Sequence, residues 1–398
     1  MSADQEVIII YRDHLLYPSE TFVRAQANAL KRHFPVFAGL RRVPGLELPE
    51  EQTRVIGSGH GVSRIREVAF KLWGVAPGFV KELRSLQPRL IHAHYGADGL
   101  RAMPLAKELN VPLIVSFHGS DATVTKVGSA KTPFGHRHYL KNKVRLQAGA
   151  SQIIAVSEFV KAKLLEQGYR DEQVRVHYIG VDTKLFSPSS AEAEPFVLFA
   201  GRLVDRKGVG YLIRAMAEVQ ADMPSLGLVV IGEGPKRQEL EALGKTMLRK
   251  VRFVGKQPPE AVRDWMARCA IFAAPSIRVE SGEEEGFGIV LIEAQAMEKP
   301  VVSFNSGGIG EAVEHGVTGF LGPERDVQVL AHNIALLARD PYLRLRAGVA
   351  GRIRTLQLFD LEKQTAKLEA IYGEVTSRFF AGCKRRESIP NGASLWSR

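Results

Sequence analysis

Residues 283–302 of this 398-residue chain carry the pattern best suited to binding a ligand. The residues of interest there are Glu285, Gly286, Phe287, Gly288 and Glu293. The glycines precede an apolar run of helical length, and at a helix start they let phosphate groups approach backbone N–H donors. The first glutamate precedes that helix and the second lies on its second turn. Both can therefore face one cleft and accept hydrogen bonds from sugar or ribose hydroxyls. The segment alone also fits an ordinary helix with a solvated glutamate and an acidic loop.

Cations and further glycine turns follow other apolar runs in the same half of the chain. Arg202 and Lys207 lie in AGRLVDRKG. Two cations at that spacing suit a diphosphate, Arg as a bidentate fork and Lys as a point charge. Gly234 belongs to IGEGP, a second strand-to-glycine turn, and NSGGIGE at residues 305–311 is a third. Several strand ends thus bring glycines, cations and carboxylates together, although a surface loop with scattered charge is the alternative interpretation.

The first half of the chain supplies one more candidate group. The sequence FHGSD closes an apolar run and contains His118, Gly119 and Asp121. His118 could hydrogen-bond a sugar hydroxyl or transfer a proton, although a lone histidine also fits a structural role. We expect His92 and His94, in IHAHYG, to be structural because no third ligand for a metal is evident.

The elements that must position these residues alternate along the whole chain. Short apolar runs alternate with amphipathic stretches, which is typical of parallel α/β architecture. The predicted strands are residues 7–11, 90–94, 113–117, 152–156, 174–179, 196–200, 227–231, 251–254, 271–274 and 301–304. A Ser-, Pro- and Glu-rich stretch at residues 187–195 predicts a linker. We therefore expect two Rossmann-like domains, with a ligand cleft at the carboxyl ends of their strands.

The composition limits the class of protein. No apolar run approaches the roughly 18 residues that span a bilayer, and the first residues lack the basic start of a signal peptide. The two cysteines, Cys269 and Cys383, exclude a disulfide scaffold and a cysteine-rich zinc site, and they fit a reducing cytosol. Residues 1–185 carry 26 Lys and Arg against 17 Asp and Glu, a balance of +9 out of +11. This charge indicates an anionic partner for the first half, or serves solubility alone.

Together these segments resemble the retaining GT-B glycosyltransferases of family four (group 1), over nearly the whole chain. The matching motifs are Glu285 with Glu293, Arg202 with Lys207, GEGP at residues 232–235, GGIGE at 307–311, IGVD at 179–182, HGSD at 118–121 and the closing FDLEKQTAKLEAIYGEV. The stretch PSETFVRAQ is similar to transferases of exopolysaccharide and lipid-linked oligosaccharide synthesis. One departure concerns the loop after the first strand, where many members have Gly-Gly and this chain has YRDHLLYPSETF.

The resemblance implies an α/β GT-B fold with an interdomain cleft. Residues 1–186 would form an acceptor-binding Rossmann-like domain, and residues 187–356 a nucleotide-sugar-binding one. Residues 357–380 would form a helix that crosses back to the first domain. We expect the polar and basic residues 381–398 to be a disordered tail.

The resemblance also implies a chemistry, that of a hexosyltransferase of EC class 2.4 using a UDP- or GDP-sugar as substrate. Arg202 and Lys207 would neutralise the leaving diphosphate, and Glu293 would hold the nucleotide ribose. Glu285 would hold hydroxyls of the transferred sugar, and His118 would lie at the reacting centre. The remaining substrate contacts would come from Gly119, Asp121, Gly234, Gly286, Phe287 and Gly288. No cofactor and no metal is expected, since no Asp-x-Asp occurs and cationic side chains can stabilise the diphosphate.

The expected acceptor is a lipid-linked saccharide, and the expected location is cytoplasmic, peripheral at the inner face of the membrane. Basic clusters that could meet an anionic leaflet are Arg64, Arg66, Lys71, Lys126, Lys131, Arg137, Lys141, Lys143 and Arg145. A soluble acceptor remains an alternative, as does a hydrolase or epimerase of the same fold. A nicotinamide-dependent oxidoreductase lacks its G-x-G-x-x-G fingerprint here, and a non-catalytic carbohydrate binder or nucleic-acid binder lacks a legible motif. The donor's base and sugar stay open.

Overall fold

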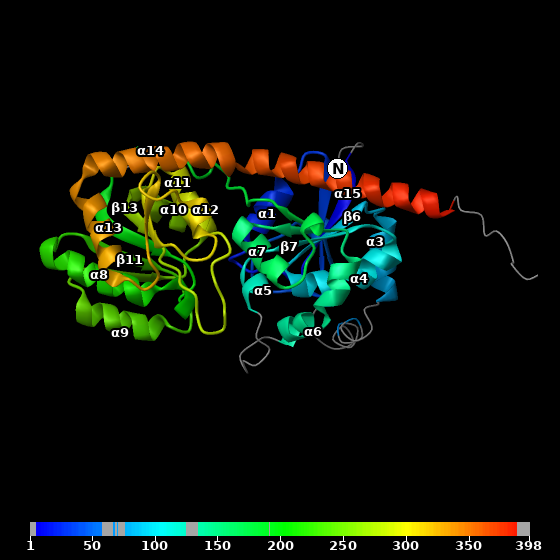
Figure 1. Cartoon of the computed structure of the whole chain (residues 1–398), viewed down its shortest axis with the longest axis horizontal. Helices are drawn as coiled ribbons and strands as arrows, with labels where there is room; N and C mark the ends of the chain where they lie inside the picture. The colour runs from blue at the N-terminus through cyan, green and yellow to red at the C-terminus, as the bar shows by residue number, and fades with distance from the viewer. Residues whose placement is uncertain are drawn as a thin grey trace, which may run out of the picture.

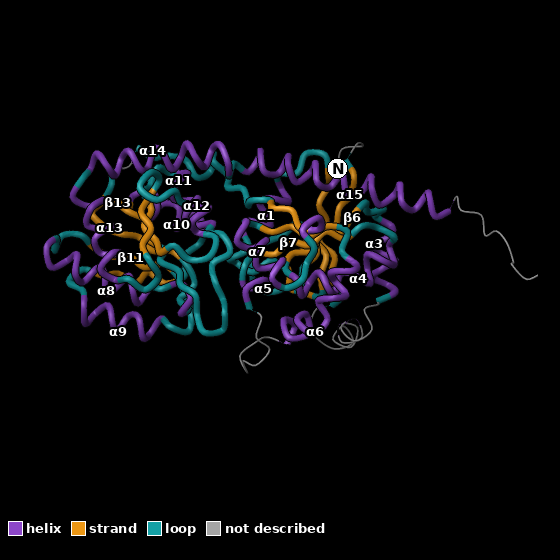
Figure 2. The backbone as a smooth tube through the Cα atoms, in the orientation of Figure 1, coloured by secondary structure: helices purple, strands orange, loops and turns teal. Residues whose placement is uncertain are grey.

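The computed structural model describes residues 5–57, 67, 70, 76–124, 134–190 and 192–387. Figure 1 shows two α/β domains side by side, each built on its own parallel sheet. In Figure 2 the strands form the centre of each domain and the helices lie outside them. A sheet covered in this way is buried on both faces, which is why its strands are continuous apolar runs. The two-domain α/β architecture expected from the sequence is confirmed.

The sheet of the first domain is formed by β1 (Glu6–Tyr11), β3 (His33–Gly39), β5 (Thr53–Val55), β6 (Leu90–His94), β7 (Leu113–Phe117), β8 (Gln152–Ala155) and β9 (Val174–Val176). These strands are parallel and their order is β5-β3-β1-β6-β7-β8-β9, so the winding reverses between β1 and β6. A short parallel pair, β2 (His14–Leu15) and β4 (Arg41–Arg42), follows the carboxyl ends of β1 and β3. The helices of this domain are α1 (Thr21–Asn28), α3 (Pro77–Ser85), α4 (Gly96–Leu109), α5 (Ser120–Thr123), α6 (Phe134–Gly149) and α7 (Glu158–Glu166).

The sheet of the second domain is formed by β10 (Glu194–Ala200), β11 (Gly227–Ile231), β12 (Val251–Gly255), β13 (Cys269–Ala273), β14 (Val301–Phe304) and β15 (Gly319–Gly322). The order β12-β11-β10-β13-β14-β15 reverses the winding between β10 and β13. Ligands of open parallel sheets bind at such switch points, outside the carboxyl ends of the strands. The helices of this domain are α8 (Val209–Asp222), α9 (Arg237–Met247), α10 (Pro259–Arg268), α11 (Ile289–Ala296), α12 (Ile309–Ala312), α13 (Val327–Arg339) and α14 (Pro341–Leu358).

The last helix, α15 (Leu361–Glu387), leaves the second domain and lies along the first (Figure 1). The Glu369 carboxylate accepts hydrogen bonds from the backbone N–H groups of Lys31 and Arg32, at 3.0 and 2.7 Å. Residues 381–387, which we expected to be disordered, belong to this helix. The Arg89 guanidinium lies 4.5 Å from the ring centre of Phe380, a contact that ties this end of α15 to the first domain. Residues 388–398 of the expected tail lie outside the described residues.

A second-domain carboxylate caps a helix of the first domain. Glu311, on α12, accepts hydrogen bonds from the N–H groups of Glu158 and Phe159 at 2.8 and 2.9 Å. These are N–H groups of the first turn of α7, which have no partner within the helix. The Tyr178 hydroxyl donates to the same carboxylate at 3.0 Å. The Ser157 hydroxyl, which caps α7 from its own side, donates to the backbone oxygen of Gly286 at 2.6 Å.

The membrane-related expectations concern long apolar helices and basic surface residues. No helix within the described residues combines the length and the apolar composition needed to cross a bilayer. The basic residues named in the sequence that lie outside the described ranges are Arg64, Arg66, Lys71, Lys126 and Lys131.

Candidate active site

Three loops with predicted ligand-binding residues meet at the carboxyl edge of the second sheet. The loop after β10 carries Arg202 and Lys207, the long loop after β13 carries Glu285, and residues 305–308 follow β14. The strands β10 and β13 pair directly, and β13 pairs with β14. The three loops are therefore neighbours in space as well as at the switch point of the sheet.

Glu285 is the centre of this edge. Its Oε2 accepts hydrogen bonds from Lys207 Nζ at 2.5 Å, from Arg206 Nη1 at 3.2 Å and from Ser276 Oγ at 3.2 Å. The side chain is only 14% exposed. Burial alone would raise the pKa of this carboxyl, but Lys207 and Arg206 outweigh it and hold the pKa at about 2. Glu285 is therefore a fixed negative charge at neutral pH.

The two predicted phosphate-binding cations differ in their surroundings. Lys207 is 19% exposed, and burial lowers its pKa while Glu285 raises it, with a net lowering. Arg202 is exposed, and its side chain makes no hydrogen bond or ion pair with any other described residue. Arg202 is still close enough to lower the pKa of Lys207 through charge repulsion. One cation thus has a partner, whereas the other is available to a ligand.

Glu293 lies on the second turn of α11, where the sequence placed it. It is partly buried, and no other described residue hydrogen-bonds or ion-pairs with its carboxyl group. Burial raises the pKa of this carboxyl to about 7. Glu293 does not share the contacts of Glu285, so the two carboxylates are separate groups with opposite pKa shifts. A half-buried carboxyl without a partner is ready to accept hydrogen bonds from hydroxyl groups.

The two domains touch through glycines beside Glu285. A Cβ atom on Gly119, in the first domain, would lie 2.8 Å from both N and Cα of Gly286. A Cβ on Gly286 would lie 2.1 Å from the backbone oxygen of His118. Cβ atoms in protein structures essentially never lie this close to a backbone atom, so both positions require glycine. The contact brings the His118 turn of the first domain against the Glu285 loop of the second.

The His118 turn is fastened by Asp121. Its Oδ1 accepts the N–H groups of His118 and Gly119 at 2.9 and 3.0 Å, and its Oδ2 accepts that of Gly96 at 3.2 Å. Among the described residues, its hydrogen-bond donors are thus backbone groups of its own domain. Asp121 therefore holds the turn, and its role as a substrate contact stays a prediction. His118 itself packs between the rings of Phe22 and Tyr95, at 5.0 and 4.7 Å.

The other predicted site residues contribute backbone rather than side chains. Phe287 is buried and packs against the rings of Tyr178 and Phe359, at 5.4 and 5.2 Å, so its side chain faces the core. Gly288 has φ +89° and is the N-cap of α11, a conformation that glycine adopts without strain. A Cβ on Gly234 would lie 2.3 Å from the backbone oxygen of Leu203, so this glycine lets the loop after β11 pack on the Arg202 loop.

Two contacts of Glu285 were missed by the sequence interpretation. Arg206 adjoins Lys207 in a short 3-10 turn (Asp205–Lys207), which directs both cations to one carboxylate. The doublet of cations was the signal that could have identified it. Ser276 follows β13 in a loop without any motif, and no signal in the sequence marked it.

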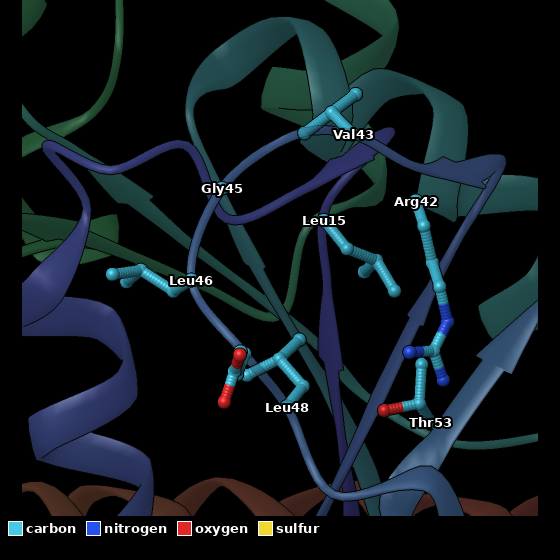
Figure 3. A pocket seen from close by; sticks show the side chains of 8 residues that line it. Leu15, Arg42, Val43, Gly45, Leu46, Leu48 and Thr53 are labelled. Carbon is cyan, nitrogen blue, oxygen red and sulfur yellow. The ribbon is translucent and has the colours of Figure 1, made fainter.

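The described surface has little free volume at this cluster. A cavity of about 10 Å³ is lined by Lys207, Ala274, Ser276, Glu285, Gly288, Val290, Leu291 and Ile309. Ligand pockets usually measure about 300–1,000 Å³, so this cavity by itself is too small for a nucleotide sugar. A larger cavity of about 350 Å³ lies in the first domain, beside the β2–β4 pair (Figure 3). It is lined by Leu15, Arg42, Val43, Gly45, Leu46, Glu47, Leu48 and Thr53, and none of the predicted site residues is among them.

The arrangement offers cations, carboxylates and glycine turns at one edge. No group of three or more His, Cys, Asp or Glu side chains in the described ranges is arranged to hold a metal ion. Arg202, Arg206 and Lys207 supply positive charge there, and Glu285 supplies an acceptor for hydroxyl groups, whereas Glu293, on α11, makes none of these contacts. Such a set can bind a diphosphate next to hydroxyl-bearing rings.

Two family models match the chain, one in its first half and one mainly in its second. The model described as Glycosyltransferase Family 4 matches residues 19–185, and the model described as Glycosyl transferases group 1 matches residues 181–354. The amylovoran biosynthesis glycosyltransferase AmsK of Erwinia amylovora is 31% identical over 253 residues, which are 60% of this chain and 58% of that protein. The match thus spans less than two thirds of that relative.

A mannosyltransferase and a solved structure extend the comparison. The GDP-mannose-dependent alpha-(1-6)-phosphatidylinositol monomannoside mannosyltransferase of Mycolicibacterium smegmatis is 29% identical over 307 residues, 71% of this chain and 78% of that protein. The crystal structure of Anabaena HepE in complex with UDP and glucose has a TM-score of 0.74 and 22% identity. It covers 93% of this chain and 99% of that chain, and at this identity it shows a common GT-B fold.

Proposed function

The chain belongs to the glycosyltransferases of family 4 and group 1, and from this premise we propose that it transfers a hexose-type sugar, with retention, to a lipid-linked saccharide. The donor is a UDP- or GDP-sugar. The observation that carries the proposal is the Glu285–Lys207–Arg206 cluster, which lies at the carboxyl edge of the second sheet and adjoins the His118 turn.

The cations of the loop after β10 support a nucleotide-diphosphate donor. Lys207 and Arg202 would bind the diphosphate. Lys207 would first release the carboxylate of Glu285, whereas Arg202 is already exposed. HepE is described as binding UDP, and the M. smegmatis relative as depending on GDP-mannose, so both nucleotides are reasonable donors. Glu293 would accept hydrogen bonds from the ribose and Glu285 from the transferred sugar.

The proposed reaction follows from where charge develops. The bond between the anomeric carbon and the diphosphate oxygen breaks, and its electron pair stays with the diphosphate. An acceptor hydroxyl supplies the pair for the new bond on the same face of the sugar, and its proton passes to the departing diphosphate. Fixed cations at Arg202 and Lys207 stabilise the growing negative charge, which is usually the largest single contribution to such a rate. His118 would lie beside the transferred sugar, as a hydrogen-bonding group.

A lipid-linked acceptor and a peripheral location at the inner membrane face are supported by the charge of the first domain. The helix α6 contains Arg137, Lys141, Lys143 and Arg145 and no acidic residue. Lys141 and Arg145 are exposed, and between them Val144 is 69% exposed. Each cation near an anionic leaflet contributes about 1 kcal/mol. AmsK acts in amylovoran biosynthesis, and the M. smegmatis relative is described by a phosphatidylinositol-linked acceptor.

The decisive experiment is transfer with defined substrates. The purified chain is incubated in turn with UDP-glucose, UDP-galactose, UDP-N-acetylglucosamine and GDP-mannose, each with lipid-linked or soluble saccharides. A thermal-shift screen selects the nucleotide first, because a ligand at about 100 times its dissociation constant adds roughly 2.7 kcal/mol of stability. Mass spectrometry detects the product and NMR its anomeric configuration. An inverted product would contradict retention. Donor hydrolysis at an equal rate without acceptor would indicate a hydrolase.

A further inference from the structure

Three buried histidines form a column behind the proposed reacting centre. His92 and His94 stand two residues apart on β6, so their side chains leave the same face of the strand. Their ring centres are 4.4 Å apart and nearly parallel. His118, which follows β7, stacks on His94 with ring centres 5.2 Å apart.

His94 and His118 share a hydrogen bond that leaves one nitrogen of His118 unused. His94 Nδ1 lies 3.0 Å from His118 Nε2. The remaining ring nitrogen, His118 Nδ1, is buried and has no hydrogen-bond partner among the described residues. An orphaned buried nitrogen costs free energy unless something binds it. In the proposed function that partner is the donor sugar.

The hydrogen bond has to be made between neutral rings. Burial lowers the pKa of both imidazoles well below its ordinary value, and the positive charge of Arg12 lowers both further. Arg12 is itself held by ion pairs with Asp98 and Glu20, and it reaches the backbone oxygen of His94 at 3.4 Å. Two neutral imidazoles that share a hydrogen bond contribute one proton to it, so the tautomer of one ring fixes that of the other.

We propose that His94 is a positioning residue for the transfer reaction, because its Nδ1 holds the ring of His118 in one orientation, couples the tautomers of the two rings and leaves Nδ1 of His118 free for the substrate. This inference rests on the proposed role of His118. Without the bond, the ring could turn over about its Cβ–Cγ bond and exchange Nδ1 for a carbon, and both tautomers would be populated. His94 does not itself meet the substrate, since it is 1% exposed behind His118.

The far end of the column supplies a matched control. The hydroxyl of Tyr372, on α15, shares a 2.6 Å hydrogen bond with His92 Nδ1. The other ring nitrogen, His92 Nε2, shares a 2.7 Å hydrogen bond with Ser116 Oγ. Tyr372→Phe therefore disturbs the same stack, one ring further away, and leaves the His94–His118 bond in place. We expect this variant to retain wild-type kcat within about threefold, on the scale of a single altered neutral hydrogen bond.

The test compares two replacements of His94. Asn places an amide atom where the imidazole has Nδ1, whereas Phe keeps a flat ring without any hydrogen bond. We expect His94→Phe to lower kcat by about 10- to 100-fold with little change in the dissociation constant of the donor, as for a misplaced catalytic group. His94→Asn should recover most of that loss. Circular dichroism and thermal melting establish that both variants are folded.

A spectroscopic measurement separates positioning from packing. In protein labelled with ¹⁵N-histidine, His118 is assigned by the signals lost in His118→Gln. We expect one tautomer for His118 in the wild type and in Tyr372→Phe, and a changed or averaged tautomer in His94→Phe. An unchanged His118 spectrum in His94→Phe, or wild-type kcat in that variant, would overturn the proposal. Full transfer activity in His118→Gln would overturn it too, while leaving the glycosyltransferase activity itself established.

Discussion

Lys207 Nζ lies 2.5 Å from Oε2 of Glu285, although the proposed function assigns the two side chains to different parts of the donor. Breaking a buried pair by removing one partner is costly, so each charge compensates the other until a ligand arrives. A diphosphate that binds Lys207 must compete with this carboxylate, and Glu285 keeps Arg206 and Ser276 as partners when Lys207 moves. In the proposed function, donor binding would thus exchange the partner of Lys207.

Replacing Glu285 with Gln should reduce transfer by about 10- to 100-fold while the protein remains folded. The change keeps the size of the side chain and removes a charge-assisted hydrogen bond to the transferred sugar, worth about 1.5–3 kcal/mol. Steady-state kinetics measure the rate and circular dichroism the fold. Ser276→Ala removes one neutral donor to the same carboxylate and should have a much smaller effect. Wild-type turnover in folded Glu285→Gln would remove this residue from the site.

Arg202→Ala and Lys207→Ala should each lower kcat by about 100- to 1000-fold, if each cation acts like a removed transition-state donor. Lys236→Ala is the matched control. Lys236 lies in the neighbouring loop and ion-pairs with Asp205 and Glu239, both at 3.0 Å. Its loss should leave kcat nearly unchanged. Equal effects of all three substitutions would indicate a general loss of positive charge rather than specific contacts.

Chelation should leave the wild-type rate nearly unchanged. The reason is that Arg202, Lys207 and Arg206 supply the positive charge that a divalent ion would otherwise bring to the diphosphate. Transfer is measured after dialysis against EDTA and again after adding Mg²⁺ or Mn²⁺. A strict requirement for either ion would contradict the assignment of charge stabilisation to these side chains.

Donor affinity should decrease below about pH 7 because of Glu293. Burial raises the pKa of its carboxyl to about 7, and only the ionised form offers the proposed charged acceptor for the ribose. The dissociation constant of the nucleotide should therefore rise by up to about tenfold for each pH unit below 7. Calorimetric titrations between pH 5.5 and 8 measure it. Glu293→Gln should bind more weakly at pH 8 and show a flat profile.

The raised pKa of Glu293 also predicts how the stability of the protein depends on pH. The pKa in the folded protein lies above the ordinary value of 4.5, so the stability contributed by Glu293 is present below pH 4.5 and is lost as the pH rises through 7. Denaturant unfolding should thus show Glu293→Gln to be more stable than the wild type at pH 8, by about 1–3 kcal/mol, and nearly equal to it at pH 4. An equal free energy of unfolding at pH 8 would show that the carboxyl is not buried as described.

Changing Lys141, Lys143 and Arg145 together to Glu should abolish binding to anionic vesicles. Wild-type protein should sediment with phosphatidylserine-containing liposomes at low salt and much less at high salt, because these charges act over a Debye length of about 8 Å at physiological ionic strength. The control changes the charges of Arg175, in the first domain, and of Arg378, on α15 beside it, because both have partners within the protein. Equal partitioning to neutral and anionic vesicles, or to neither, would leave a soluble acceptor as the better hypothesis.

The strands of this fold could be predicted from the sequence where both faces are buried. The predicted strands match β6, β7, β11 and β14 at residues 90–94, 113–117, 227–231 and 301–304. The reason is that a short apolar run bounded by polar residues is typical of a buried strand. β3 was missed, since HFPVFAG contains a proline and begins with a histidine, and strands with proline are usually at an edge. Its neighbours β1 and β5, rather than its own sequence, place it inside the sheet.

The site was predictable as a set of motifs but not as a set of contacts. Glycines and charged residues at strand ends indicated which loops converge. The partner exchange at Lys207, the orphaned nitrogen of His118 and the backbone role of Asp121 all depend on distances between residues far apart in the chain. Phe287 shows the opposite case, because a conspicuous aromatic residue in a motif turned out to face the core. Motif membership does not tell in which direction a side chain points.

The hydrogen bonds of the Glu311 cap must break before the two domains can separate. Its carboxylate stands on the second domain while the N–H groups it satisfies belong to α7 of the first, so separating the domains leaves the N–H groups of Glu158 and Phe159 without this partner, although Ser157 still caps the helix. Losing such a cap costs about 0.5–2 kcal/mol, and one to two kcal/mol biases an equilibrium by a factor of about 5–30. The two hydrogen bonds therefore favour the arrangement in which the domains touch, and any motion that separates the domains has to break them first.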